Sequence, residues 1–193
     1  MEFERKLAVD TAETLDQILN SPAIQQVICQ PMEEIPMETT YYGDENGYLS
    51  AHLWTLRRRM EGENSVVTCK TPGDGPYSRG EWEVSCNDLH TALPMLVEAG
   101  APKELTELVG LHPTCGAKFL RRAILLDLGS CKVELALDLG KLFREDREGP
   151  ICELELELKD GDPAAMLALG DKLCAEYGLR DEPKSKFYRA SRL

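Results

Sequence analysis

Apolar and charged positions alternate one by one in the segment ICELELELK, residues 151–159. Successive side chains of a β-strand point to opposite faces, so the leucines share one face and the charged residues share the other. The charged positions are Glu153, Glu155, Glu157 and Lys159. Three carboxylates spaced roughly 7 Å apart along a strand repel one another unless water or cations lie between them. A solvent-exposed outer face would explain this strand when it is considered alone.

The same alternation recurs in other segments, and the sign of the charge differs between them. Carboxylates dominate the strand at 151–159, whereas arginine and lysine dominate the segments 54–60 and 66–70. The polar positions that share a face within their segments are Glu2, Glu4 and Lys6, Arg57 and Arg59, Thr68 and Lys70, and Arg79, Glu81 and Glu83. A closed barrel with helices outside explains this segregation, because apolar positions then pack against helices and charged positions point inward.

Capping and turn residues divide the chain into the elements of an α+β fold. The expected strands span residues 2–9, 32–42, 54–60, 66–70, 78–86, 114–127, 131–139 and 151–159. The expected helices start at Asp10 or Thr11, Asp88, Pro102 and Asp162, and a further helix covers the basic tail at 184–192. The segment 71–76 is expected to be a loop, and the tight turn at 128–130 favours antiparallel pairing. We expect a single domain, residues 1–193.

Charges inside a barrel persist only when they are paired or bound to ions. Carboxylates suit hard divalent cations, and arginine and lysine suit phosphate oxygens, so a complex of metal and polyphosphate would satisfy both sets. The net charge of −12 and the pI of about 4.8 oppose non-specific binding to nucleic acid or to an anionic membrane. They do not oppose a phosphate site where basic side chains cluster.

Targeting signals and cysteine usage indicate a cytoplasmic protein. The N-terminal sequence MEFERKLAVD is acidic from its second residue and has no apolar core, so we expect no signal peptide. No stretch approaches the roughly 18 to 20 apolar residues of a membrane span. The seven cysteines are scattered and form no CxxC pair, which indicates buried thiols in a reducing compartment. We expect no nucleic-acid or membrane partner, and either a monomer or a homodimer.

Seven short motifs follow one another from residue 2 to residue 189: EFERK at 2–6, LRRR at 56–59, TCK at 68–70, SRGEWEV at 78–84, ELALDLG at 134–140, ICELELEL at 151–158 and SKFYR at 185–189. Their order and content resemble the CYTH family, the triphosphate tunnel metalloenzymes, whose hallmark is an N-terminal ExExK strand. The last two motifs, with Gly161-Asp162 and the segment 178–180 between them, look most like the bacterial inorganic triphosphatases.

This resemblance implies a closed antiparallel eight-stranded β-barrel, the triphosphate tunnel fold, with helices packed outside. It implies hydrolysis of inorganic triphosphate to pyrophosphate and phosphate with Mg2+ or Mn2+. The implied metal ligands are Glu2, Glu4, Glu153 and Glu155. The implied substrate-binding residues are Lys6, Arg57, Arg59, Lys70, Arg79, Glu81, Arg121, Lys186 and Arg189. Glu155, Asp138 and Lys70 are the catalytic candidates, and the two carboxylates among them would orient the attacking water.

Alternatives stay open for several of these residues and for the activity. Asp138 could cap a turn, and Arg79 with Glu81 could form an internal ion pair. Lys186 and Arg189 could belong to a solvated basic tail. Two departures from the family pattern bear on the phosphate grip and the tunnel mouth: Ala123 replaces a basic residue, and GDENGYL at 43–49 replaces the usual turn. The same scaffold could serve thiamine or nucleoside triphosphates, cyclise ATP, or bind polyphosphate without turnover.

Overall fold

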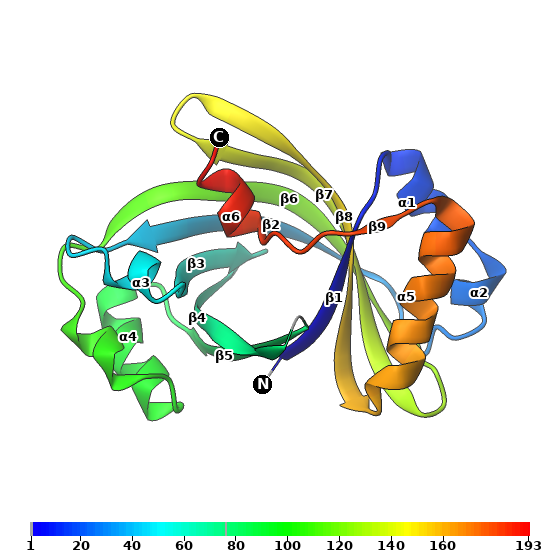
Figure 1. Cartoon of the computed structure of the whole chain (residues 1–193), viewed down its shortest axis with the longest axis horizontal. Coiled ribbons are helices and arrows are strands. Elements are labelled where there is room, and N and C mark those ends of the chain that lie inside the picture. The colour runs from blue at the N-terminus through cyan, green and yellow to red at the C-terminus, as the bar shows by residue number, and fades with distance from the viewer. Residues whose placement is uncertain (1, 76) are drawn as a thin grey trace.

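Eight strands form the wall of a closed antiparallel barrel in the computed structural model, which describes residues 2–75 and 77–193 apart from the side chain of Glu2 (Figure 1). These strands are β1 (Glu2–Ala8), β2 (Glu33–Gly43), β3 (Thr55–Glu61), β4 (Asn64–Gly75), β5 (Ser78–Ser85), β6 (His112–Asp127), β7 (Cys131–Arg144) and β8 (Arg147–Gly161). They pair in the order β5-β4-β3-β2-β6-β7-β8-β1, and pairing of β5 with β1 closes the barrel. The closed barrel expected from the sequence is therefore confirmed.

Helices and a ninth strand surround this wall in the described ranges (Figure 1). They are α1 (Ala12–Leu19), α2 (Pro22–Gln25), α3 (Tyr48–Ala51), α4 (Leu89–Glu98), the 3-10 helix η1 (Lys103–Glu107), α5 (Pro163–Tyr177), β9 (Arg180–Asp181) and α6 (Lys186–Ala190). The side chains of Thr11, Asp88 and Asp162 cap α1, α4 and α5, each by accepting a hydrogen bond from a backbone N–H. Such caps satisfy amides that have no partner within the helix, so these expected helix starts are confirmed.

The structure corrects the expected loop at 71–76. β4 continues to its end at Gly75, because this segment pairs with β5 as far as Gly75 opposite Ser78. The register shifts between Pro72 and Gly75, which accommodates a proline that cannot donate a ladder hydrogen bond. Residue 76 lies outside the described residues. The sequence also underestimates β7 and β8, which continue as one long hairpin up to the pair Arg144 and Arg147.

Two apolar clusters attach the helices to the outside of the wall (Figure 1). On one side α1, α2 and α5 cover β1, β7 and β8, where Leu7, Leu135 and Leu154 are fully buried. On the other side α4 and η1 pack against β3 and β4, where Leu56 and Leu96 are fully buried. Burial of each such side chain contributes about 1.5–3 kcal/mol, which fixes the apolar face of each strand outward. The charged faces of the same strands therefore point into the barrel.

A third apolar cluster lies beneath α6, which crosses the barrel near the C-terminus (Figure 1). It contains Met37, Phe119, Leu142 and Ile151 from the wall and Ala190 from α6. This contact docks α6 onto the barrel although the helix is short. No helix within residues 2–75 and 77–193 is both long and apolar enough to cross a membrane.

Candidate active site

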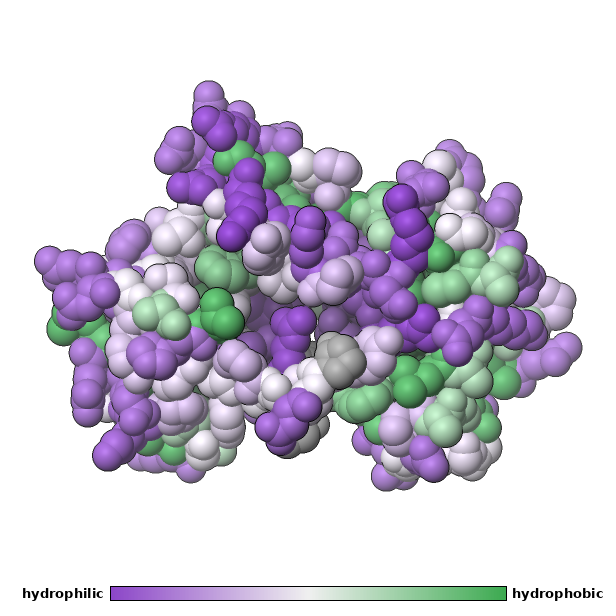
Figure 2. All heavy atoms as spheres, viewed as in Figure 1, coloured by the Kyte–Doolittle hydropathy of each residue, from purple (hydrophilic) through white to green (hydrophobic). Residues whose placement is uncertain are grey.

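A cavity of about 500 Å³ occupies the barrel interior, and charged side chains make up most of its lining. Figure 2 shows a hollow on this face of the molecule, bordered by hydrophilic side chains. Ten residues expected at the site line the cavity: Glu4, Lys6, Arg57, Arg59, Lys70, Arg79, Glu81, Arg121, Glu155 and Lys186. Three others, Asp138, Glu153 and Arg189, make ion pairs with one another or with the lining residues. The side chain of Glu2 lies outside what the structure describes.

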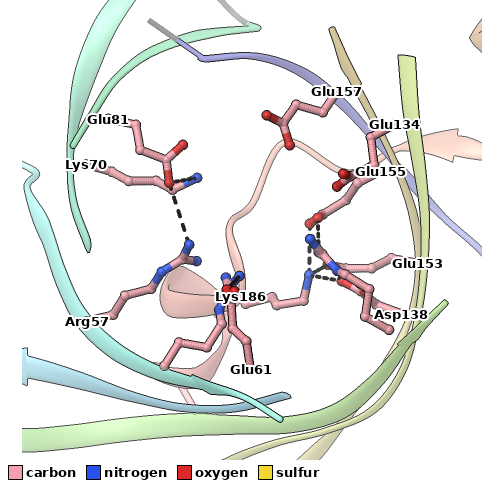
Figure 3. Close-up of polar contacts among 12 residues, drawn as sticks. Arg57, Glu61, Lys70, Glu81, Glu134, Asp138, Glu153, Glu155, Glu157 and Lys186 are labelled. Atoms are coloured by element: carbon pink, nitrogen blue, oxygen red, sulfur yellow. Dashed lines mark hydrogen bonds and ion pairs between the residues drawn. The ribbon is translucent and has the colours of Figure 1, made fainter. Parts of the chain in front are cut away.

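Asp138 of β7 and Glu153 and Glu155 of β8 form a buried carboxylate cluster (Figure 3). Asp138 lies directly opposite Glu153 in the register of the two strands. Asp138 and Glu153 are 0% exposed and Glu155 is 9% exposed. One oxygen of each side chain lies within 4.8 Å of the others. Because β7 continues to Arg144, Asp138 sits within a strand, and the alternative that it caps a turn is wrong.

Lys186 and Arg121 neutralise this carboxylate cluster. Lys186 Nζ lies 2.6 Å from Asp138 Oδ2 and 2.8 Å from Glu155 Oε1, and it also contacts Glu153 (Figure 3). The guanidinium of Arg121 donates to both oxygens of Asp138, at 2.8 and 2.7 Å, and to Glu155. A paired arrangement of this kind is what buried charges require.

The helix α6 supplies a second cation to the cluster. Arg189 pairs with Glu153 and follows Lys186 by three residues, which places both side chains on one face of the helix. Ser185 caps this helix by accepting a hydrogen bond from the N–H of Tyr188. Lys186 is 6% exposed. The alternative of a solvated basic tail is therefore wrong for this part of the C-terminus.

The buried cations hold Asp138 and Glu155 ionised. Burial raises the pKa of Glu155, but the charges of Lys186 and Arg121 outweigh burial and keep this pKa well below its usual range. The pKa of Asp138 is lowered for the same reasons. Burial alone would lower the pKa values of Lys186 and Arg121, but the nearby carboxylates outweigh burial. The net result is that both pKa values lie above their ordinary values. Asp138 and Glu155 are consequently ionised at neutral pH, and so are Lys186 and Arg121.

Arg57 and Arg59 of β3 and Lys70 of β4 form a basic wall of the cavity, and Figure 3 shows Arg57 and Lys70 on the side opposite the carboxylate cluster. Glu81 pairs with two of them, at 3.6 Å from Arg57 Nη2 and 3.1 Å from Lys70 Nζ, so it does form an internal ion pair. Arg59 lies 3.3 Å from Glu61. Among the described residues, no atom accepts a hydrogen bond from the buried Nε of Arg57 or of Arg59. Burial, followed by repulsion from the neighbouring guanidinium groups, lowers the pKa of Arg59 to about 10.

Six further charged residues line the cavity although the sequence reasoning did not assign them to the site: Glu33, Glu61, Glu83, Glu134, Glu157 and Lys159. Lys159 Nζ lies 2.9 Å from Glu157 and 3.4 Å from Glu134. The sequence contains a signal for most of them, because Glu157 and Lys159 continue the charged face of the segment 151–159 and Glu83 shares a face with Arg79 and Glu81. Glu61 continues the alternation of the two inward arginines of β3, and Glu134 lies four residues before Asp138 on the same face of β7.

Arginines of the opposite parity face outward. Arg5 on β1 donates to Asp181 of β9 and Asp171 of α5, both at 2.8 Å, and so ties these elements to the barrel. Arg58 donates to a backbone carbonyl beyond β5, and Arg122 pairs with a carboxylate of α1. Strand parity therefore separates arginines that hold the outer elements from arginines that line the cavity.

The residues of the site fit a divalent cation and a phosphate group. Carboxylate oxygens are the donors that Mg2+ and Mn2+ prefer, and the three buried carboxylates bring one oxygen each into close range. Guanidinium and ammonium groups are the usual ligands of phosphate oxygens. The two sets face each other across one cavity, so a polyphosphate with its metal could contact both.

Comparisons with known proteins agree with this arrangement. The sequence model of the CYTH domain matches residues 1–191. An inorganic triphosphatase from Haemophilus influenzae is 31% identical over 126 residues, which cover 64% of this chain and 36% of that protein. The match thus spans about a third of the relative's length.

Solved structures share the fold at low sequence identity. A Hippeastrum protein, described as an adenylyl cyclase candidate with a dominant triphosphatase activity, has a TM-score of 0.66 at 19% identity, covering 100% of this chain and 95% of that one. The PH1819 protein of Pyrococcus horikoshii OT3 has a TM-score of 0.64 at 19% identity, covering 98% and 97% of the two chains.

Proposed function

Because this chain belongs to the CYTH family, we propose that its barrel hydrolyses inorganic triphosphate to pyrophosphate and phosphate with the help of Mg2+ or Mn2+. The Haemophilus influenzae relative is an inorganic triphosphatase, which supports the same activity here. The match covers only part of that relative, so the proposal depends on the site itself.

The segregation of buried charge inside one cavity carries the proposal. In the wall made by Arg57, Arg59 and Lys70, the buried Nε atoms of both arginines donate to no described atom. Burying such guanidinium groups is costly unless an anion binds to them. A triphosphate supplies that anion, and its charge exceeds what a single carboxylate could provide.

Phosphoryl transfer requires a protein mainly to position the substrate and to neutralise its charge. We assign the grip on the phosphate oxygens to Lys6, Arg57, Arg59, Lys70, Arg79, Arg121, Lys186 and Arg189. Glu81 orients two of these cations, and Lys70 also acts in catalysis by stabilising charge on the transferred group. Ala123 lines the cavity without charge, so Arg121 supplies the positive charge of β6 at this level.

Glu2, Glu4, Glu153 and Glu155 would hold the divalent cation, with Asp138 beside them. A bound cation supplies neutralising charge for phosphate oxygens and a more acidic water as the nucleophile. Glu155 and Asp138 are the side chains that would orient the attacking water, because both remain ionised in spite of burial.

The cavity favours an inorganic triphosphate over a nucleotide. The aromatic side chains in its described lining are Tyr41 and Phe187. Their rings pack on each other with centroids 5.2 Å apart, and Tyr41 is 2% exposed. A base or a thiazole ring would need an accessible aromatic or apolar face on which to stack. The lining offers charge instead.

The test is phosphate release from tripolyphosphate, ATP, thiamine triphosphate and pyrophosphate, each with Mg2+, Mn2+ or EDTA. We expect fast release from tripolyphosphate alone, and none in EDTA. Faster release from ATP or thiamine triphosphate would assign an organic substrate. Tight binding of tripolyphosphate without release would make the barrel a binding module, and production of cyclic AMP from ATP would make it a cyclase.

A further inference from the structure

Lys186 occupies the centre of the carboxylate cluster. Its ammonium contacts all three members, Asp138, Glu153 and Glu155, and two of these contacts are 2.6 and 2.8 Å long. The lysine is 6% exposed and comes from α6, whereas the carboxylates belong to the barrel wall. A side chain from a separate element thus fills the position at which the oxygens of three wall residues converge (Figure 3).

The same oxygens are the ones suited to a divalent cation. An ammonium is a compact point charge, and it uses the carboxylate oxygens that a hard metal ion would use. The local charges balance without metal, because three carboxylates face the three cations Arg121, Lys186 and Arg189. A divalent cation that joined this set unchanged would leave two uncompensated positive charges in a buried place, which is unfavourable.

We propose that Lys186 is an internal counter-ion that exchanges with the divalent cation, and that the released ammonium then binds the triphosphate. The proposal rests on the function proposed above and adds an order to it. The cation displaces Lys186 from the carboxylates, and the four-carbon stem of the lysine lets its ammonium turn from the wall toward the cavity. The ammonium of Lys186 thereby neutralises the carboxylates when no metal is bound and the triphosphate when metal and triphosphate are bound.

This exchange makes metal and triphosphate bind cooperatively. The cation alone must displace a well-paired ammonium and leaves excess positive charge, so its binding is weak. The triphosphate compensates the excess charge and accepts the released ammonium, so each ligand strengthens the binding of the other. Such coupling is reciprocal and typically amounts to a factor of about 5–150 in affinity.

The experiment measures Mn2+ binding by electron paramagnetic resonance, which reports free Mn2+ and needs no turnover. The anion is an imidotriphosphate, whose nitrogen bridges resist hydrolysis. We expect the imidotriphosphate to tighten Mn2+ binding to the wild type about tenfold or more. In Lys186→Met we expect Mn2+ alone to bind about tenfold more tightly than in the wild type, and the gain from the imidotriphosphate to shrink.

Lys159→Met is the matched control, because Lys159 also lines the cavity and pairs with two carboxylates outside the cluster. It should keep the wild-type Mn2+ affinity within a factor of about 2 and keep the coupling. Mn2+ binding to Lys186→Met that is no tighter than to the wild type would overturn the proposal. The proposal would also be overturned if the imidotriphosphate left the affinity of the wild type for Mn2+ unchanged.

Two further measurements keep the outcome decisive. If Lys186→Met fails to fold by circular dichroism, Lys186→Gln takes its place with the same expected gain in Mn2+ affinity, and a titration without protein subtracts the Mn2+ that the imidotriphosphate itself chelates. Phosphate release from tripolyphosphate is measured separately. Coupled Mn2+ binding without release would remove the proposed hydrolysis and leave the exchange standing, whereas release with uncoupled Mn2+ binding would remove the exchange alone.

Discussion

Replacing Arg59 by methionine should stabilise the fold and damage triphosphate binding at the same time. Arg59 is 7% exposed, and within the described residues its one ion pair joins it to Glu61 at 3.3 Å, while its Nε donates to nothing. Methionine has a similar length, carries no charge and adapts its shape to irregular sites. The substitution therefore removes a strained charge without leaving a large cavity.

The size of the effect follows from the pKa of this guanidinium. Burial, and then repulsion by Arg57 and Arg121, lower the pKa of Arg59 to about 10. An ordinary arginine titrates above about 12 and each unit of pKa corresponds to about 1.4 kcal/mol, so holding this charge in the folded barrel costs about 3 kcal/mol. This cost already includes the opposing attraction of Glu61, which raises the pKa. We expect the free energy of unfolding to rise by about 3 kcal/mol in Arg59→Met.

Arg59→Met should stabilise the fold at every practical pH. The folded-state pKa of Arg59 lies below the unfolded value, so below pH 10 both states are protonated and the full cost of the buried charge is present. The cost disappears only as the pH rises through the interval between the two values. Urea unfolding at pH 7 thus measures the whole effect, and the melting temperature should rise by about 6–12 °C.

The assay compares wild type, Arg59→Met and Arg58→Met, each with and without tripolyphosphate and Mg2+. Arg58 is the control because it lies on the same strand, faces outward and donates to the backbone of Asn87. At about 100 times the dissociation constant a ligand should stabilise the wild type and the control by about 2.7 kcal/mol. Arg59→Met should gain far less. An Arg59→Met protein that is less stable than the wild type without ligand would refute the reasoning and make Arg59 a structural residue.

Three further outcomes test other parts of the structure. Glu4→Gln should abolish phosphate release, while its circular dichroism spectrum and melting temperature stay the same as those of the wild type. Near-normal phosphate release would show that Glu4 is not a metal ligand. Arg5→Ala should lower the free energy of unfolding by about 2 kcal/mol, because it removes the ion pairs to Asp171 and Asp181. The activity of the folded fraction should stay intact, and a selective loss of kcat would contradict a structural role outside the barrel. Cys29 is exposed, whereas burial raises the pKa of the Cys69 thiol to about 12. Iodoacetamide at pH 8 should therefore label Cys29 and leave Cys69 unlabelled until the protein unfolds. Labelling of Cys69 in the native protein would contradict its burial.

Strand parity made the lining of the barrel predictable from the sequence. In the segment 54–60 the two arginines at odd positions line the cavity, and Arg58 between them faces outward. In the segment 151–158 the leucines reach the outer core, and Glu155 and Glu157 reach the cavity. A period of two leaves only two choices for a strand, and the apolar face decides between them. The same rule would have found Glu61.

Contacts between distant elements could not be predicted in this way. No local pattern indicates that Lys186 of the C-terminal helix lies against Asp138 and Glu155, because that contact depends on how α6 docks over the apolar cluster inside the barrel. Strand length is a similar case. Residues 71–75 carry the proline and glycines typical of a loop, and they form a strand because β5 offers them hydrogen-bond partners.

An acidic protein can hold a polyanion because the two charges occupy different places. The net charge of −12 describes the whole molecule, and exposed charges on its surface are screened within about 8 Å at physiological ionic strength. The basic wall of the cavity is enclosed by the barrel and is screened far less, so the local field decides what binds there. Within the cavity the carboxylates of β7 and β8 contact buried cations, whereas each guanidinium group of β3 pairs with one carboxylate and keeps a buried Nε that donates to no described atom. The donors that lack an acceptor therefore lie on the β3 side, where the phosphate oxygens would bind, and the carboxylates across from it become available to metal only as Lys186 leaves them.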